Sequence, residues 1–168
     1  MGSMGLQDAL FKCNLSFESP KALNFSDQLM EFISYNAIES SSELAKERGS
    51  YETFKGSKWD RGIFPLDSLT MLEEERGDHI DVNKITSMDW EELKEKVKKH
   101  GMRNSNTMAI APTATISNIA GCFPCIEPIY KNIYVKSNIS GEFTVVNSYL
   151  VKDLKDFYEY ASSEFDFL

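Results

Sequence analysis

The chain has 168 residues, of which 42% are hydrophobic and 26% charged, and its formal net charge is −8. This composition is typical of a globular protein with a core, and the length indicates one domain or part of a larger one. The acidity excludes a non-specific nucleic-acid binder, which needs a basic surface. Neither an apolar run of membrane-spanning length nor a signal peptide is present, so we expect a cytoplasmic protein without a membrane partner.

The first half of the chain is predicted to hold one long helix followed by an ordered loop. We interpret residues 1–3 as a cloning scar. Residues 21–48 have apolar side chains at helical spacing, and Gly49 is placed to end the helix. The expected buried face consists of Phe25, Leu29, Phe32, Ile33, Ala37 and Leu44. Residues 50–65 carry several aromatic side chains, which usually need a core to pack against.

Two shorter helices are predicted next. Asp67 is placed to cap a helix over residues 68–76. Another begins at a cap formed by Ser87 or Asp89 and ends at His100, where basic residues suit a helix C-terminus.

The remaining third has a different character. Residues 107–111 form a short apolar run that we interpret as a buried parallel strand. Residues 133–136 and 142–146 are expected to be strands joined by a turn. Asn147 is placed to cap a final helix through Leu154.

A hydroxyl-rich turn follows Pro112, and it has the features of an anion site. It consists of Thr113, Ala114, Thr115, Ile116 and Ser117. Small residues allow a ligand to approach the backbone, and successive N–H groups can donate to phosphate oxygens. An ordinary strand-to-helix turn with hydroxyl caps is the commoner explanation of these residue types taken alone.

Several separated motifs place this turn in a wider context. They are Gly5–Leu10, Tyr35 with Ala37, Leu44–Ala45, Gly49–Phe54, Gly101–Ser105, Ala111–Ile119, Gly121, Ile126–Pro128, Asn132–Tyr134, Ser140–Phe143 and Val146–Asn147. In this order they resemble the C-terminal half of the α subunit of ribonucleotide reductases, closest to a bacterial class I form. The resemblance covers roughly residues 4–155, and its ordered motifs are more specific than one short motif would be.

The resemblance implies a fold and a chemistry. The family reduces ribonucleotides to the deoxyribonucleotides used in DNA replication, by a cysteine thiyl radical inside a ten-stranded α/β barrel. We therefore expect an α/β fold with long helices packed on a few mostly parallel strands. The family's turn binds the substrate diphosphate, a role that falls here on Thr113, Ala114, Thr115, Ile116 and Ser117. Expected partners are the remainder of the α subunit, a ribonucleoside diphosphate, and a β subunit whose dimetal centre supplies the radical; no cofactor is expected in this chain.

The sequence also departs from the family. The catalytic Asn-x-Cys-x-Glu motif and the radical-transfer tyrosine pair are absent from it. We therefore expect a chain that is inactive alone, either an excised fragment or one product of a split gene. The alternative is a stand-alone phosphate-binding or protein-interaction module derived from the barrel. In either case an incomplete barrel would leave edges through which copies could associate.

Four other features could have either a structural or a functional role. Cys122-Phe123-Pro124-Cys125 has redox-motif spacing, but a structural loop is favoured over a redox or metal site. Arg103 is expected in a salt bridge rather than on a phosphate, and Glu127 as a buried hydrogen-bonding carboxylate. Glu73, with the two glutamates after it, is interpreted as a solvated helix face.

The tail, residues 156–168, is acidic and aromatic. It faintly resembles the C-terminal peptides of β subunits, but the end of a helix is the favoured interpretation.

Overall fold

The computed structural model describes residues 1–139 and 141–164. The chain forms two compact units. We call Met1–Ser3 with Glu18–Pro112 the helical unit, and Met4–Phe17 with the described residues from Thr113 onward the hairpin unit. Within the described residues, no helix is both long enough and apolar enough to cross a membrane.

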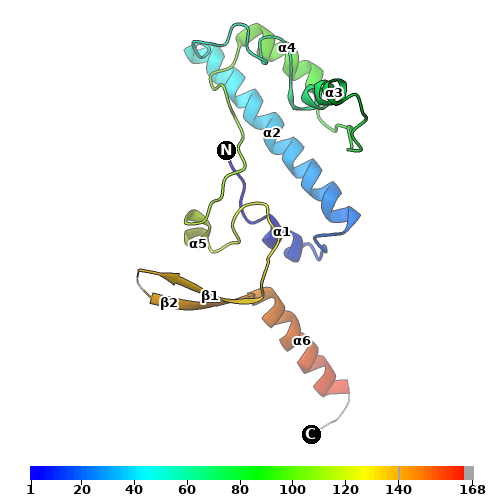
Figure 1. Ribbon diagram of the computed structural model, residues 1–168, viewed down its shortest axis with the longest axis vertical. Coiled ribbons are helices and arrows are strands. Elements are labelled where there is room, and N and C mark those ends of the chain that lie inside the picture. The colour runs from blue at the N-terminus through cyan, green and yellow to red at the C-terminus, as the bar shows by residue number, and fades with distance from the viewer. Residues whose placement is uncertain (140, 165–168) are drawn as a thin grey trace. The chain divides into compact units, whose positions relative to one another are not determined.

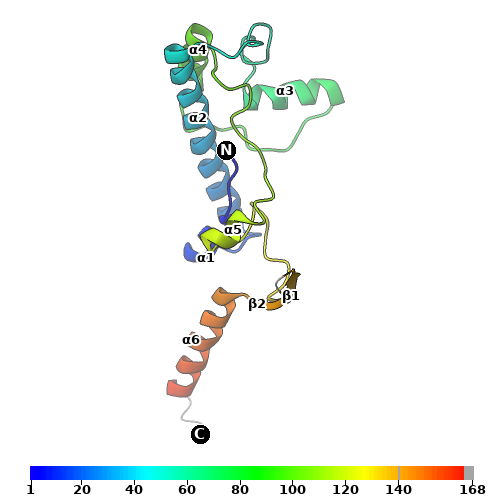
Figure 2. The same cartoon turned by 90° about the vertical axis from the view of Figure 1, so that its left-hand side faces the viewer.

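The helical unit is built on one long helix, α2 (Pro20–Arg48), with α3 (Pro65–Arg76) and α4 (Trp90–His100) packed near it (Figure 1). Ser19 accepts a hydrogen bond from the N–H of Ala22 at the start of α2, and Gly49 ends the helix, as predicted. Helix α3 runs across the direction of α2 (Figure 2).

Helix α4 lies alongside α2 and runs in the same direction. Trp90 at its start donates to Glu31, and Lys96 further along pairs with Glu39 at 2.6 Å. Asp89 is the N-cap, accepting from the N–H of Glu92, so one of the two predicted caps is confirmed. Gly101 ends the helix where a Cβ would collide with the side chain of Ser50, so only glycine fits.

The core of the helical unit lies between these helices and the aromatic loop. It consists of Tyr35, Ile38, Phe64, Leu93, Val97 and Met102. Tyr51, Phe54 and Trp59 from the loop pack against it, and Trp90 stacks edge-on against Tyr35 at 5.5 Å. The prediction that residues 50–65 form an ordered, aromatic-packed loop is confirmed.

The predicted buried face of α2 is wrong for Phe32 and Leu44, which are 57% and 37% exposed. The other four residues of that face, Phe25, Leu29, Ile33 and Ala37, are only partly buried. The buried residues of α2 are Ala22, Tyr35, Ile38, Ser41, Ser42 and Ala45. Towards the C-terminus of α2, residues 102–104 dock on the helix, and the side chains that α2 buries there are the small ones of Ser41, Ser42 and Ala45. The N–H of Arg103 donates to the carbonyl of Ser41 at 3.0 Å.

The strand predicted for residues 107–111 is also wrong. This segment has no regular structure, and Ile110 is 83% exposed. Its neighbour is the N-terminus: the N–H of Ala109 donates to the carbonyl of Met1, and the Met1 amine donates to Thr107. An apolar run becomes a strand only where another strand pairs with it, and none does so within the described residues.

The hairpin unit contains α1 (Leu6–Lys12), α5 (Ile116–Ala120), β1 (Ile133–Asn138), β2 (Gly141–Val146) and α6 (Ser148–Glu164). The two strands form one antiparallel sheet, with Ile133 opposite Val146. Both predicted strands are therefore confirmed, but the expected parallel arrangement is not. The described residues hold this hairpin and no ten-stranded barrel.

Asn147 joins the hairpin to α6. Its N–H and side-chain amide donate to the backbone and side-chain oxygens of Asn132, while its own oxygen accepts from the N–H groups of Tyr149 and Leu150. The predicted cap is thus confirmed. The helix continues to Glu164, beyond Leu154, so the described part of the tail, 156–164, is helical. Residues 165–168 lie outside the described residues.

Candidate functional site

The hydroxyl-rich turn lies in the hairpin unit and leads into α5. Thr113 has a φ of 45°, a left-handed conformation that β-branched residues rarely adopt. The turn closes through the N–H of Ser117, which donates to the carbonyl of Thr113 at 3.0 Å. Within the described chain, the N–H groups of Ala114, Thr115 and Ile116 have no hydrogen-bond acceptor. Three consecutive donors are thus available at this turn.

The predicted hydroxyl donors are placed differently from one another. Ser117 is only 1% exposed, and its hydroxyl donates to the carbonyl of Ala114 at 3.4 Å, so it holds the turn from within. Thr113 accepts from the N–H of Cys125 at 2.8 Å. Thr115 is exposed and is the hydroxyl best placed to meet a ligand. Asn118, which sequence reasoning did not single out, also braces the carbonyl of Ala114 at 2.7 Å.

The loop from Cys122 to Cys125 is hydrogen-bonded to both ends of the turn. Gly121 ends α5 in a left-handed conformation, and the N–H of Cys122 donates to the carbonyl of Ser117 at 3.0 Å. Cys125 is itself left-handed, with a φ of 55°. Loop and turn therefore form one connected backbone network, in which two strained residues, Thr113 and Cys125, are hydrogen-bonded to each other.

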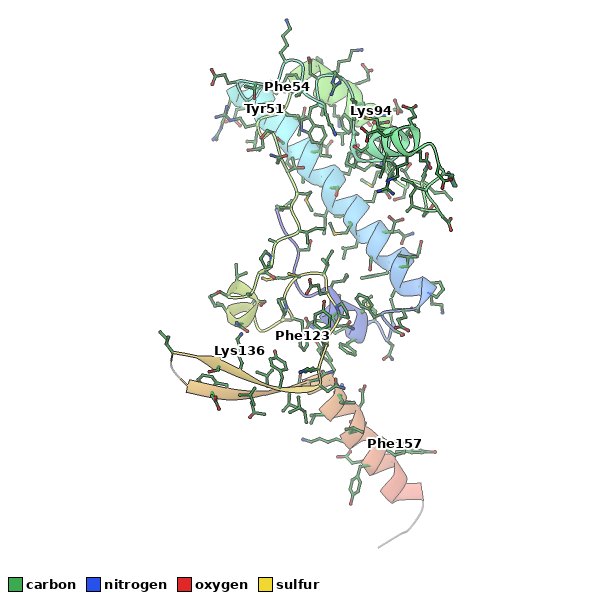
Figure 3. The ribbon with its side chains drawn as sticks, in the orientation of Figure 1. Tyr51, Phe54, Lys94, Phe123, Lys136 and Phe157 are labelled. Carbon is green, nitrogen blue, oxygen red and sulfur yellow. The ribbon has the colours of Figure 1, made fainter. Side chains whose placement is uncertain are left out.

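Asp8 fixes this loop to the rest of the hairpin unit. One of its oxygens accepts from the N–H of Phe123 at 2.8 Å and the other from the hydroxyl of Tyr149 at 3.0 Å. The N–H of Gly5 donates to the carbonyl of Phe123, and Figure 3 shows Phe123 beside α1. Burial, together with the bond to Asp8, raises the pKa of Tyr149. Sequence reasoning missed Asp8, because its partners lie over a hundred residues away in the chain.

A largely apolar cavity of about 400 Å³ adjoins this loop. Its aromatic lining comes from Phe123, Tyr130 and Tyr134, with Glu127 and Lys131 as its charged members. Glu127 is exposed, so the expectation of a buried carboxylate is wrong. Its charge raises the pKa of Tyr130, with burial adding to the effect.

Two further expectations concern the helical unit. Arg103 forms no salt bridge among the described residues; its guanidinium donates to the carbonyl of Gly49 at 3.4 Å, which helps to end α2. Glu73 is not simply solvated. Hydrogen bonds from Lys84 and from the N–H of Ile80, with the nearby charge of His79 adding to them, hold the pKa of Glu73 at about 2.

A metal centre finds no support in the described parts of the chain. Over residues 1–139 and 141–164, no group of three or more histidine, cysteine or acidic side chains is arranged to hold an ion.

Comparison with known proteins agrees on one family. The model of the ribonucleotide reductase barrel domain matches residues 1–165. Similar curated proteins include the ribonucleoside-diphosphate reductase subunit alpha of Chlamydia pneumoniae, which is 54% identical over 93% of this chain and 15% of its own length.

More distant relatives have the same name or a related one. The large chain of the same reductase from Schizosaccharomyces pombe is 42% identical over 92% of this chain and 18% of its own length. The subunit alpha of Helicobacter pylori is 41% identical, over 94% of this chain and 20% of its own length. The chain thus spans less than a quarter of the length of these relatives, and it belongs to the ribonucleotide reductase barrel-domain family.

Proposed function

We propose that this chain is the substrate-phosphate-binding part of a ribonucleoside-diphosphate reductase α subunit. The complete enzyme would reduce ribonucleoside diphosphates to deoxyribonucleoside diphosphates, and this chain alone would be inactive. The names of the relatives supply the reaction class. The inactivity rests on the sequence, since none of the three cysteines lies in an Asn-x-Cys-x-Glu motif.

The observation that carries the phosphate role is the set of unpaired N–H groups of Ala114, Thr115 and Ile116. Consecutive N–H groups next to a left-handed residue form a concave donor set that suits an anion, and a phosphate supplies the acceptors that these groups lack. The alanine keeps the turn open to a ligand, and the exposed hydroxyl of Thr115 adds a donor. Because the binding groups belong to the backbone, the net charge of −8 does not oppose a local anion site.

The reduction itself would need groups outside these 168 residues. We propose that the remainder of the α subunit supplies the cysteines, and that a β subunit with a dimetal centre supplies the radical. The part of this chain that binds substrate would hold the diphosphate in a fixed position, which contributes orientation rather than bond making.

An NMR titration of the full chain with cytidine diphosphate tests the phosphate role. We expect saturable shifts of the Ala114, Thr115 and Ile116 amides, because the ligand becomes their acceptor, with a dissociation constant on the order of 1 mM for a site detached from the rest of the enzyme. Inorganic pyrophosphate should move the same amides, since the diphosphate makes the contacts.

Matched charge variants sharpen the titration. Ala114→Asp puts a carboxylate against the anion and should abolish the shifts. Ile139→Asp adds the same charge at the exposed turn of the hairpin and should leave them unchanged. Equal responses of the two variants, or amides that stay fixed at saturating pyrophosphate, would contradict a site at this turn.

The exposed apolar surface of the hairpin unit favours association with another chain. Ile133 and Val135 on β1 are 66% and 60% exposed, and Leu154 and Phe157 on α6 are 57% and 68% exposed. Figure 3 shows Phe157 projecting away from α6. Large apolar side chains that are left exposed in this way are typical of an interface.

This surface discriminates the two functions. Mixing the chain with the remaining α segment should give a stable complex, seen by light scattering, if the chain is part of a reductase. Self-association without any binding of that segment would support the alternative, a separate interaction module derived from the barrel.

A further inference from the structure

The two cysteines of the Cys122–Cys125 loop contact opposite ends of the hydroxyl-rich turn, residues 113–117, which we call the phosphate turn below. The N–H of Cys122 donates to the carbonyl of Ser117 at 3.0 Å, and the N–H of Cys125 donates to the hydroxyl of Thr113 at 2.8 Å. Thr113 and Ser117 are the first and last residues of the turn. Any change in the backbone of this short loop therefore reaches both ends of the turn.

The two cysteines are thiols and differ in accessibility. Cys122 is half-buried, whereas Cys125 is only 9% exposed. They are separated by two residues, the spacing used by dithiols that close into a disulfide. One reachable sulfur can be attacked or can attack, and a shielded sulfur three residues away can complete the exchange.

The centre of the Cys122–Cys125 loop is held by hydrogen bonds, while its two ends are hydrogen-bonded to the turn. Two hydrogen bonds hold Phe123. Its N–H donates to the carboxylate of Asp8 at 2.8 Å, and its carbonyl accepts from the N–H of Gly5 at 2.9 Å. A disulfide requires the two Cβ atoms to lie roughly 3.5–4.5 Å apart with a defined torsion. Because Phe123 is anchored and Cys125 already has a left-handed backbone, closing the bond would shift the N–H of Cys125 relative to Thr113.

We propose that Cys122 and Cys125 form a redox modification site that regulates the phosphate turn; this inference rests on the proposed phosphate-binding function. The oxidant is a small disulfide such as oxidised glutathione. The Cys122 thiolate attacks one of its sulfurs, which breaks that S–S bond and releases one thiolate. The Cys125 thiolate then displaces the second. Two electrons pass from the protein to the oxidant, and the two cysteine protons end on the two released thiols.

The closed form would bind phosphate less well than the dithiol form. Loss of the bond from Cys125 frees the left-handed Thr113 to relax, and the three donors that follow it lose their common direction. We expect affinity for pyrophosphate to fall about tenfold on oxidation, which corresponds to about 1.4 kcal/mol.

The first measurement establishes the bond. The full chain is equilibrated with mixtures of reduced and oxidised glutathione, alkylated and analysed by mass spectrometry. We expect the loss of two hydrogen atoms, located in the peptide that spans Cys122 and Cys125. Cys13→Ser, which removes the exposed third thiol, should leave this result unchanged. Cys122→Ser keeps the backbone hydrogen bond to Ser117 but should abolish the disulfide and with it the loss of two hydrogen atoms.

The second measurement connects the bond to the turn. Amide spectra of the reduced and oxidised chain are compared without ligand, and we expect shifts at Thr113 to Ser117 in the wild type and Cys13→Ser but not in Cys122→Ser. Failure to close the disulfide, pairing with Cys13 instead, or closure that leaves these amides unmoved would each overturn the proposal. If oxidation shifts the amides of the turn but pyrophosphate leaves the amides of the reduced chain unshifted, only the phosphate role would be refuted.

Discussion

Three consecutive serines in α2 provide a sharp test of the packing in the helical unit. Ser41 and Ser42 are 2% and 1% exposed, whereas Ser40 is exposed. The hydroxyl of Ser41 accepts from the N–H and the side-chain amide of Asn104, at 3.0 and 3.2 Å. The hydroxyl of Ser42 is the one buried side-chain polar atom in the described chain that has no partner. Replacing each serine by alanine should therefore have three different outcomes.

The expected magnitudes follow from these contacts. Ser40→Ala changes only helix propensity and should stabilise by about 0.5 kcal/mol. Ser41→Ala leaves two donors of Asn104 without an acceptor and should destabilise by about 1–2 kcal/mol. Ser42→Ala removes an unpaired buried hydroxyl and should stabilise by about 1 kcal/mol beyond the gain seen in Ser40→Ala.

Urea unfolding of the full chain, followed by tryptophan fluorescence, measures all three. Both tryptophans, Trp59 and Trp90, pack against the core of the helical unit, so the signal reports on the right region. Thermal midpoints should shift in opposite directions for Ser41→Ala and Ser42→Ala, by about 4–8 °C per kcal/mol. If Ser42→Ala lowered stability as Ser41→Ala does, its hydroxyl would have a partner and the packing described here would be incorrect.

Two further predictions concern the same unit. The carboxyl of Glu73, whose pKa is about 2 against an ordinary value of 4.5, stabilises the fold above about pH 4.5 and stops doing so as the pH falls towards 2. The protection of the Ile80 amide, measured as its exchange rate relative to the intrinsic rate at each pH, should fall over that interval, and Glu73→Gln but not Glu74→Gln should lower it at neutral pH. Leu93→Ala, at a site with 0% exposure, should cost about 2–5 kcal/mol in urea unfolding. Its control, Ile110→Ala, lies at an exposed position and should change stability by less than about 0.5 kcal/mol; equal losses would contradict the assigned core.

The sequence was informative wherever the signal is local. Gly49 and Gly101 end helices where expected, and Asn147 caps α6, because capping depends on a few neighbouring backbone groups. The aromatic loop after α2 was recognised for a similar reason, since a cluster of rings must pack somewhere. The positions of β1 and β2 followed from a short turn between two alternating runs.

Features that depend on distant partners were not predictable in this way. The small residues that α2 buries reflect the docking of residues 102–104, which periodicity in α2 alone does not reveal. The run at 107–111 has the composition of a strand but no strand beside it. In the candidate site, the residue types of the turn were recognised, whereas the inward direction of Ser117 and the anchoring by Asp8 required tertiary contacts.

The hairpin unit is assembled from two segments that the whole of Glu18–Pro112 separates. Asp8 leaves the ribosome before its partners Phe123 and Tyr149, which follow 115 and 141 residues later. The helical unit, whose contacts all lie within the intervening stretch and the first three residues, can become compact first. It then shortens the loop that must close before α1 docks, which lowers the entropic cost of that step. Folding during synthesis is therefore expected to complete the helical core before the turn from Thr113 to Ser117 acquires its shape.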